Sequence, residues 1–249
     1  MDTAWMERTA LLVGQEGIDK LMASHVLIVG LGGVGSYAAE AIARSGVGNI
    51  TVIDGDTVDP TNRNRQLQAL VSTEGQNKAQ LMAERIRLIN PEVNLVAIDT
   101  FKKPDEMKTF LKQESFSYVI DAIDSITPKL YLLEAAYLGG QRIVSSMGAG
   151  GKMDPCKIEV ADISKTHTCP MAQHVRKQLR YMNIKKGITS VFSTELTARH
   201  SLMKTDGSRF KKSAFGTISY LPAVFGLTCA SVVIRDIVAW KEITAQDYL

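Results

Sequence analysis

The segment VLIVGLGGVGS, residues 26–36, decides the fold of this chain. Its four apolar residues at 26–29 predict a buried strand. Gly30, Gly32 and Gly35 then match the G-x-G-x-x-G pattern of nucleotide-binding turns. Because glycine has no Cβ, the backbone N–H groups of such a turn can approach a phosphate closely. The helix predicted to follow adds the positive end of its dipole to the same anion site.

A second strand is predicted at residues 50–53, and it ends in Asp54. An acidic residue at this place can accept hydrogen bonds from ribose hydroxyls. The glycine triplet alone is weak evidence, because a tight turn can carry the same glycines with no ligand bound. In combination with the flanking strand, the helix and Asp54, it favours a nucleotide site.

Strands and helices alternate along the first part of the chain. Further strands are predicted at residues 93–98, 118–121 and 143–147, and helices at residues 3–14, 17–23, 36–45, 78–89, 105–113 and 128–138. This alternation predicts an α/β fold with a Rossmann-like, doubly wound and mainly parallel sheet.

The C-terminal part is expected to extend this core with an antiparallel strand and a basic insertion. It shows predicted strands at residues 156–160 and 189–193, a basic helix at 172–182, a polar stretch at 196–214 and a long apolar helix at 216–240. The polar stretch is interpreted as a mobile insertion. We therefore expect one domain over residues 1–249, with the nucleotide-binding core in residues 1–150.

A charge-dense segment, residues 56–66, follows Asp54 and contains Asp56, Asn62 and Arg65. Its polar, proline-containing composition predicts a loop over the ligand-binding edge of the sheet. Asn62 and Arg65 can donate several hydrogen bonds to phosphates. The alternative is a solvated loop without a ligand.

The fourth predicted strand ends with Asp121, and Asp124 follows it closely. Acids at the carboxyl end of a strand lie at the ligand-binding edge of an open α/β sheet. Asp124 could therefore hold Mg²⁺, directly or through water. The alternative is that Asp124 caps the helix that follows.

Charge is unevenly distributed along the chain. Residues 165–212 contain 11 Lys and Arg against 2 Asp and Glu, a net charge of +9, whereas the whole chain of 249 residues carries +3. This asymmetry predicts a basic surface for a polyanion, and the alternative is a solvated loop. The candidate nucleic-acid ligands are Arg176, Lys177 and Arg180 on the predicted helix and Lys211 and Lys212 on the predicted insertion.

The cysteines and the apolar segments indicate whether the chain binds zinc and whether it lies in a reducing compartment or a membrane. Cys156, Cys169 and Cys229 form no C-x-x-C pair, so no structural zinc is expected, and a reducing cytoplasm fits better than a disulfide framework. No signal peptide is expected. The apolar run at residues 221–234 is shorter than the roughly 20 residues that span a bilayer, which predicts a buried core helix. Peripheral membrane association is the alternative.

Several motifs occur together in one order and spacing. They are the glycine turn, Asp54, the N-x-x-R-Q sequence at residues 62–66, Lys78, and the D-x-x-D sequence at residues 121–124. This set resembles the ThiF/MoeB family of ubiquitin-activating-like adenylyltransferases over roughly residues 4–150. The rest resembles a tRNA-modifying branch, on the segments DISKT (162–166), VFSTE (191–195) and GTISYLP (216–222).

The resemblance implies a reaction and its partners. Members of that branch use ATP to close a hydantoin ring on the threonylcarbamoyl group of an adenosine beside the tRNA anticodon. The implied partners are therefore ATP, Mg²⁺, a tRNA that carries threonylcarbamoyladenosine, and a second copy of the chain. A sulfur-relay protein, either a cysteine desulfurase or a sulfur acceptor, is a further partner that the resemblance allows.

The resemblance also implies residue roles. Gly32 and its neighbours, Gly33 included, would line the nucleotide, and Asp54 would hold the ribose. Arg65 and Lys78, with Asn62, would contact the phosphates, and Asp124 would support Mg²⁺. Arg8 matches a family arginine that reaches into the partner subunit's site, although it is also compatible with a plain surface charge. The implied catalytic residues are Arg8, Arg65, Lys78 and Asp124. A thiol nucleophile is not required, so Cys169 is interpreted as an ordinary loop cysteine, with a nucleophilic role as the alternative.

Three other functions compete with this interpretation. Adenylation of the C-terminus of a ubiquitin-like sulfur-carrier protein would predict zinc-binding cysteine pairs, which the sequence lacks. An NAD-dependent oxidoreductase would share the glycine turn and Asp54 but would not need Arg65, Lys78 and Asp124 together. A tRNA-binding protein with an inactive nucleotide site would fail to exchange pyrophosphate into ATP.

Overall fold

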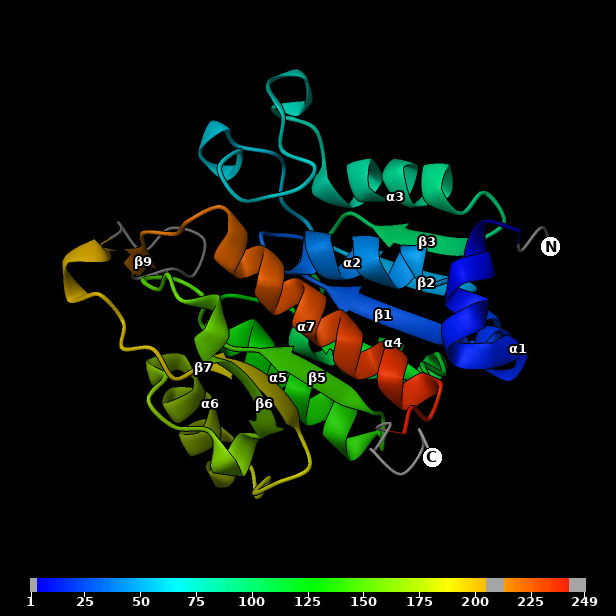
Figure 1. Ribbon diagram of the computed structural model, residues 1–249. Helices are drawn as coiled ribbons and strands as arrows, with labels where there is room; N and C mark the ends of the chain where they lie inside the picture. The colour runs from blue at the N-terminus through cyan, green and yellow to red at the C-terminus, as the bar shows by residue number, and fades with distance from the viewer. Residues whose placement is uncertain (1–3, 205–212, 242–249) are drawn as a thin grey trace, which may run out of the picture.

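A central sheet of seven strands organises the computed structural model, which describes residues 4–204 and 213–241 (Figure 1). The strands are β1 (His25–Val29), β2 (Asn49–Ile53), β3 (Asn94–Ile98), β4 (Tyr118–Asp121), β5 (Ile143–Ser146), β6 (Ile158–Asp162) and β7 (Thr189–Ser193). Their order across the sheet is β3-β2-β1-β4-β5-β7-β6. Every neighbouring pair is parallel except β6 and β7, which are antiparallel.

This strand order confirms the predicted doubly wound sheet with an antiparallel extension. The chain builds β1, β2 and β3 outward in one direction, then crosses to the other side of β1 to build β4 and β5. The direction therefore reverses between β1 and β4. In open α/β sheets a ligand crevice lies outside the carboxyl ends of the strands at such a switch point.

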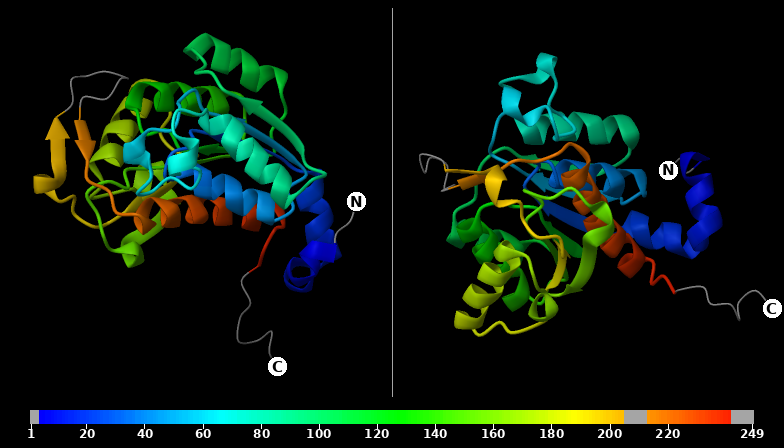
Figure 2. Two further views of the ribbon diagram at one scale, coloured as in Figure 1. Left: turned by 90° about the horizontal axis from the view of Figure 1, so that it is seen from above. Right: turned by 60° about the vertical axis from the view of Figure 1, so that its left-hand side comes forward.

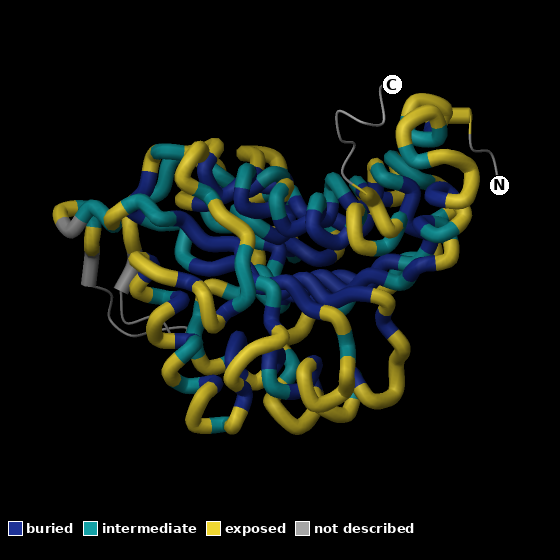
Figure 3. The backbone as a smooth tube through the Cα atoms, turned by 60° about the horizontal axis from the view of Figure 1, so that its bottom comes forward, coloured by how far each residue is buried: buried dark blue, intermediate teal, exposed yellow. Residues whose placement is uncertain are grey.

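Helices cover both faces of the sheet (Figures 1 and 2). They are α1 (Glu7–Ala23), α2 (Gly35–Arg44), α3 (Lys78–Ile89), α4 (Pro104–Gln113), α5 (Ile126–Leu138), α6 (Pro170–Tyr181) and α7 (Tyr220–Ile237). One core cluster joins the sheet to α2, α3 and α7, and a second joins it to α4, α5 and α6. Figure 3 shows the buried strands between exposed outer surfaces.

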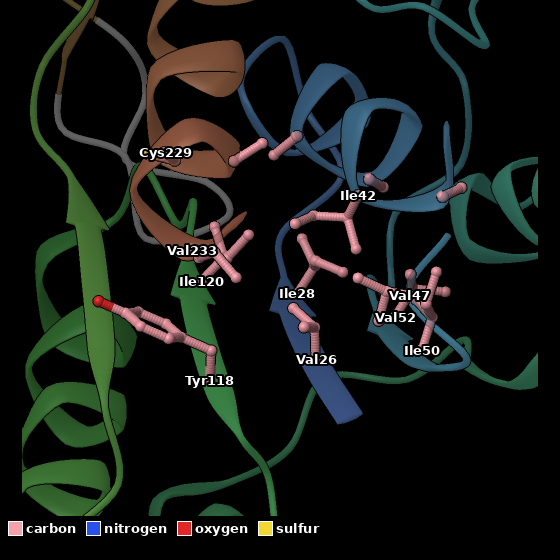
Figure 4. Packing of buried hydrophobic residues seen from close by; sticks show 14 of the residues in the cluster. Val26, Ile28, Ile42, Val47, Ile50, Val52, Tyr118, Ile120, Cys229 and Val233 are labelled. Carbon is pink, nitrogen blue, oxygen red and sulfur yellow. The ribbon is translucent and has the colours of Figure 1, made fainter. Parts of the chain in front are cut away.

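Alternation along the strands explains the two clusters. Successive side chains of a strand point to opposite faces of a sheet. In β1, Val26 and Ile28 belong to the cluster with α2 and α7, whereas Leu27 and Val29 belong to the other. Figure 4 shows Val26 and Ile28 on the side of Ile42. A strand buried on both faces reads as a continuous apolar run, as the sequence predicted.

Helix α7 lies against α2, where Gly226 allows close approach. A Cβ on Gly226 would overlap the backbone carbonyl oxygen of Val34. By length and hydropathy α7 is apolar enough to cross a membrane, and 50% of it is buried inside the fold. The predicted burial of residues 221–234 is confirmed along the face that meets the core, for example at Leu221 and Phe225. The helix begins at Tyr220 and not at residue 216.

Other elements also differ from the prediction. β6 begins at Ile158 and not at residue 156, because Pro155–Lys157 form a 3₁₀ turn, and α5 and α6 each begin two residues earlier than predicted. The two N-terminal helices are one element, α1, with a kink at Gly14 (φ 71°), and a 3₁₀ turn at Ala4–Met6 precedes it. Residues 196–214, predicted as an insertion without strands, contain β8 (Leu202–Lys204) and the start of β9 (Ser213–Phe215), which pair antiparallel. Residues 205–212 between them, and therefore Lys211 and Lys212, lie outside the described residues.

Candidate functional site

The glycine turn follows β1 at the switch point of the sheet. The Gly30 N–H donates to the carbonyl oxygen of Ile53 at 2.8 Å, which continues the pairing of β1 with β2. Gly30 has φ +89°, a conformation that side chains with a Cβ rarely adopt. A Cβ on Gly35 would overlap the carbonyl oxygen of Gly30. These two glycines are therefore required by the tight path of the backbone itself.

Gly32 differs from the other glycines of the turn because space is open around it. A Cβ on Gly33 would lie 3.0 Å from Cβ of Pro222 in α7, so Gly33 is closely packed. The nearest atom to a Cβ on Gly32 would be Nε2 of Gln66, at 3.8 Å. Oε1 of Gln66 is buried and has no hydrogen-bond partner among the described residues. The turn thus presents an open cradle that fits a phosphate, beside an acceptor that suits a donor group of a ligand.

Asp54 fixes this turn from the end of β2. Its Oδ2 accepts a hydrogen bond from the Leu31 N–H at 2.6 Å, and its Oδ1 accepts one from the Asp56 N–H at 2.8 Å. Burial raises the pKa of the Asp54 carboxyl above its ordinary value, while the charge of Lys78 and the two backbone bonds oppose that rise. Each carboxylate oxygen keeps further acceptor capacity toward a ribose hydroxyl.

Lys78 begins α3 and points its ammonium back to the same edge. Asn77 caps this helix by accepting from the N–H groups of Ala79 and Gln80. The Lys78 N–H donates to the Asp56 carbonyl oxygen at 3.0 Å, and its Nζ lies 3.3 Å from Oδ2 of Asp56. The Lys78 side chain is only 6% exposed. The structure therefore brings Lys78, Asp54 and Asp56 together at the ligand edge of the sheet.

The segment after Asp56 crosses the ligand edge through a 3₁₀ turn at Pro60–Asn62. Asn62 is buried, and its Oδ1 accepts from the Asp59 N–H at 3.2 Å. Arg65 is half-buried, and its Nη1 donates to the Thr61 carbonyl oxygen at 2.9 Å. Burial lowers the pKa of the Arg65 guanidinium, and the charge of Asp124 opposes that shift.

Asp124 reaches the site from the loop after β4. The Ala122 N–H donates to the Val29 carbonyl oxygen at 2.9 Å, which holds this loop beside the glycine turn. Asp124 is exposed, and Ser125 and not Asp124 is the N-cap residue of α5. Within residues 4–204 and 213–241, no group of three or more His, Cys, Asp and Glu side chains is arranged to hold a metal. A Mg²⁺ bound here would use Asp124 and oxygen atoms of phosphates, a common arrangement for this ion.

Arg8 is not part of this cluster. It is exposed on α1, which leads into the amino end of β1, whereas the glycine turn follows the carboxyl end (Figure 1). Met6 packs on Gly46, in the turn before β2, and this contact places the start of α1 at the amino ends of the strands. Arg8 and the nucleotide turn of its own chain therefore lie at opposite ends of β1.

The basic helix α6 is present, but its three predicted ligands are not equivalent. Nη1 of Arg176 donates to the Thr166 carbonyl oxygen at 2.6 Å and contacts its Oγ1, so this arginine holds the loop before α6. Lys177 and Arg180 are exposed. Tyr181, at the end of the helix, is 71% exposed, which places an aromatic ring beside these charges.

Sequence reasoning missed one charged residue near the site. Lys129 lies in α5 with 0% exposure and pairs with Asp121. A lysine in the mostly apolar helix ITPKLYLLEAAYL, whose other charged residue is Glu134, was the available signal, because a charge is rarely buried without a partner. Cys169 is buried at the N-cap position of α6, a structural place that fits its interpretation as an ordinary cysteine.

A glycine turn at the switch point of a doubly wound sheet, surrounded by Asp54, Lys78, Arg65 and Asp124, defines a phosphate-binding α/β protein. The chain belongs to the ThiF family, whose sequence model matches residues 6–249.

Individual relatives are similar along nearly the whole chain. The tRNA threonylcarbamoyladenosine dehydratase of Bacillus subtilis (strain 168) is 43% identical over 243 residues, which is 95% of each chain. The enzyme of the same name from Escherichia coli (strain K12) is 39% identical, again over 95% of each chain. The crystal structure of E. coli TcdA in complex with ATP superposes with a TM-score of 0.85 at 39% identity, covering 96% of each chain.

Proposed function

We propose that this protein is an ATP-dependent tRNA threonylcarbamoyladenosine dehydratase. It closes the threonylcarbamoyl side chain of an adenosine beside the anticodon into a hydantoin ring. One observation carries the proposal. Similarity to the B. subtilis dehydratase covers 95% of both chains at 43% identity, so it includes the basic C-terminal part as well as the nucleotide site. A match restricted to residues 1–150 would have supported adenylation alone.

The chemistry requires an activated carboxylate. A carboxylate is a poor electrophile because its oxygen leaves badly. Transfer of AMP from ATP to that oxygen releases pyrophosphate and makes AMP the leaving group. A ureido nitrogen of the same side chain then attacks the carbonyl carbon, forms the C–N bond, loses its proton and expels AMP. Because this attack is intramolecular, no enzyme thiol is needed.

Cationic side chains at the ligand edge supply the electrostatic part of the first step. Arg65 and Lys78 would offset the charge that develops on the departing pyrophosphate. Gly32 offers the open approach to the phosphates, and Asp54 accepts from the ribose. Asp124 would hold Mg²⁺, which supplies further charge neutralisation when bound. Asn62 would add a further polar contact to the phosphates. Asp56 contributes through its contact with Lys78.

The position of Arg8 supports a homodimer. Arg8 lies on α1 before the amino end of β1, whereas the nucleotide turn of its own chain follows the carboxyl end, so a role at a nucleotide site would place Arg8 in the site of a second copy. In a twofold dimer each subunit would give one Arg8 and receive one, because such an interface repeats every contact. Arg8 of the neighbouring subunit would then add its positive charge to those of Arg65, Lys78 and Mg²⁺.

The tRNA would meet the basic face that includes α6. Lys177 and Arg180 are exposed there, and exposed Lys165, Lys185 and Lys186 flank the helix in sequence. A tRNA substrate implies a cytoplasmic protein. The family resemblance also implies that a sulfur-relay protein could dock on the chain. The sequence also offers Lys211 and Lys212 as tRNA ligands, and both lie outside the described residues.

Product analysis tests the proposal directly. The protein is incubated with ATP, Mg²⁺ and tRNA that carries threonylcarbamoyladenosine, and the nucleosides are then analysed by mass spectrometry. We expect the modified adenosine to lose the mass of one water, with one AMP formed per ring closed. The matched control is the same tRNA without the threonylcarbamoyl group. AMP formation with a sulfur-carrier protein but none with the modified tRNA would overturn the proposal.

A further inference from the structure

The most deeply buried charges of the described residues lie directly beneath the candidate site. Lys129 in α5 and Asp121 at the end of β4 both have 0% exposure, and Nζ of Lys129 lies 2.5 Å from Oδ2 of Asp121. Neither side chain reaches the surface where a nucleotide would bind. These two side chains can therefore affect the site only through the backbone and side chains that they contact.

The pair ties the ends of two neighbouring strands together. Nζ of Lys129 also donates to the Ser146 carbonyl oxygen at 2.9 Å and lies 3.3 Å from Oγ of Ser145. Oγ of Ser145 in turn donates to Oδ2 of Asp121. Asp121 ends β4, and Ser145 and Ser146 end β5, so the network spans the carboxyl ends of both strands.

The second oxygen of Asp121 holds the loop that carries Asp124. Oδ1 of Asp121 accepts a hydrogen bond from the Ile123 N–H at 3.1 Å. The carbonyl group of the intervening residue, Ala122, packs closely against the glycine turn. A Cβ added to Gly30 would lie 2.9 Å from the Ala122 carbonyl oxygen. The network thus fixes both the loop and one wall of the turn.

Stability alone does not account for such a pair. Desolvation of two buried charges costs several kcal/mol, and well-packed apolar residues of similar volume often stabilise a fold as well or better. An apolar pair cannot accept the Ile123 N–H, however. We propose that Lys129 and Asp121 are positioning residues of the nucleotide site, which orient residues 122–124 and hence Asp124. This inference rests on the proposed function for the identity of the ligand, ATP.

Two single variants test the pair in the full-length protein. Asp121→Asn keeps the shape of the side chain but weakens its hold on Lys129, and Lys129→Met removes the ammonium. The control is Tyr118→Phe, which removes the 3.1 Å hydrogen bond to Asp236 at the opposite end of the same strand. Calorimetry measures ATP affinity with and without Mg²⁺, and hydrogen exchange measures protection of the Ile123 amide.

We expect both variants to weaken ATP binding in the presence of Mg²⁺ by about tenfold, which corresponds to roughly 1.4 kcal/mol. Exchange at Ile123 should become faster in both. Tyr118→Phe should lower the melting temperature while it leaves ATP affinity and the Ile123 exchange rate unchanged. Variants that lose thermal stability but keep wild-type affinity and exchange would overturn the inference.

A double variant covers the case in which the single ones do not fold. Asp121→Leu with Lys129→Met removes both buried charges, so it should remain folded. It still lacks the acceptor for Ile123, and we expect weak ATP binding and fast exchange. Wild-type behaviour of this variant would refute the positioning role. If the wild-type protein binds no ATP, the proposed function fails, and exchange at Ile123 alone decides whether the pair orders the loop.

Discussion

Gly35 packs directly on Gly30 across the nucleotide turn, so that a Cβ at residue 35 would overlap the Gly30 carbonyl oxygen. The backbone cannot relieve this overlap without moving α2 away from β1. We expect Gly35→Ala to lower the free energy of unfolding by about 3 kcal/mol, as an overpacked core does. Denaturant unfolding measures the loss, and a variant as stable as the wild type would contradict this packing of the two glycines.

Gly32→Ala separates ligand binding from folding in the same turn. A Cβ there would meet only Nε2 of Gln66, at 3.8 Å. The free energy of unfolding should therefore change by less than about 1 kcal/mol. ATP affinity should nevertheless fall, because the methyl group occupies the space through which a phosphate approaches the backbone. Calorimetric titration with ATP measures this, and an unchanged affinity would place the phosphates elsewhere.

Asp124→Ala should abolish ATP-dependent activity while the fold stays intact. The residue is exposed, so its loss should alter the free energy of unfolding by no more than about 0.5 kcal/mol. Loss of a group that stabilises charge in the transition state should lower kcat at least about 100-fold. Pyrophosphate exchange and melting temperature are measured together. Near-normal turnover at saturating Mg²⁺ would reject the metal-supporting role of Asp124.

A mixture of two inactive variants tests whether Arg8 serves the neighbouring subunit. Arg8→Ala and Lys78→Ala should each be inactive alone. In a mixed dimer one site combines the intact Lys78 of one subunit with the intact Arg8 of the other. Random exchange of equal amounts should restore about a quarter of the wild-type activity. If subunit exchange is confirmed and no activity returns, Arg8 does not act across a dimer interface.

The basic face of α6 is tested by salt dependence. Replacement of Lys177 and Arg180 by Gln should weaken tRNA binding and reduce the log–log salt slope by about 0.7 to 0.9 for each phosphate that the variant no longer neutralises. ATP affinity should stay the same. The matched control replaces Lys108 and Lys112 of α4, which are also exposed. Equal slopes for the wild type and the α6 variant would show that Lys177 and Arg180 do not contact tRNA phosphates.

Most elements and the phosphate-binding edge could be predicted from local patterns. Apolar runs mark β1 and β2, glycine spacing marks the turn, and acids after strand ends mark Asp54 and Asp124. These features depend on residues close together in the sequence. The strands within residues 196–214 were not predicted, because β8 and β9 are three residues each and their pairing joins segments across residues 205–212.

The sequence by itself determined the doubly wound fold, the nucleotide turn and the family, because strand periodicity and motif spacing are local properties of the chain. Only the tertiary structure decided which charges act where. In the folded chain Arg176 donates a hydrogen bond to Thr166, and Lys129 is buried in an ion pair with Asp121. Arg8 lies at the end of β1 that is opposite the nucleotide turn. Those outcomes depend on which side chains meet after packing, and the energy of a charge depends on the partners and the dielectric that packing creates around it.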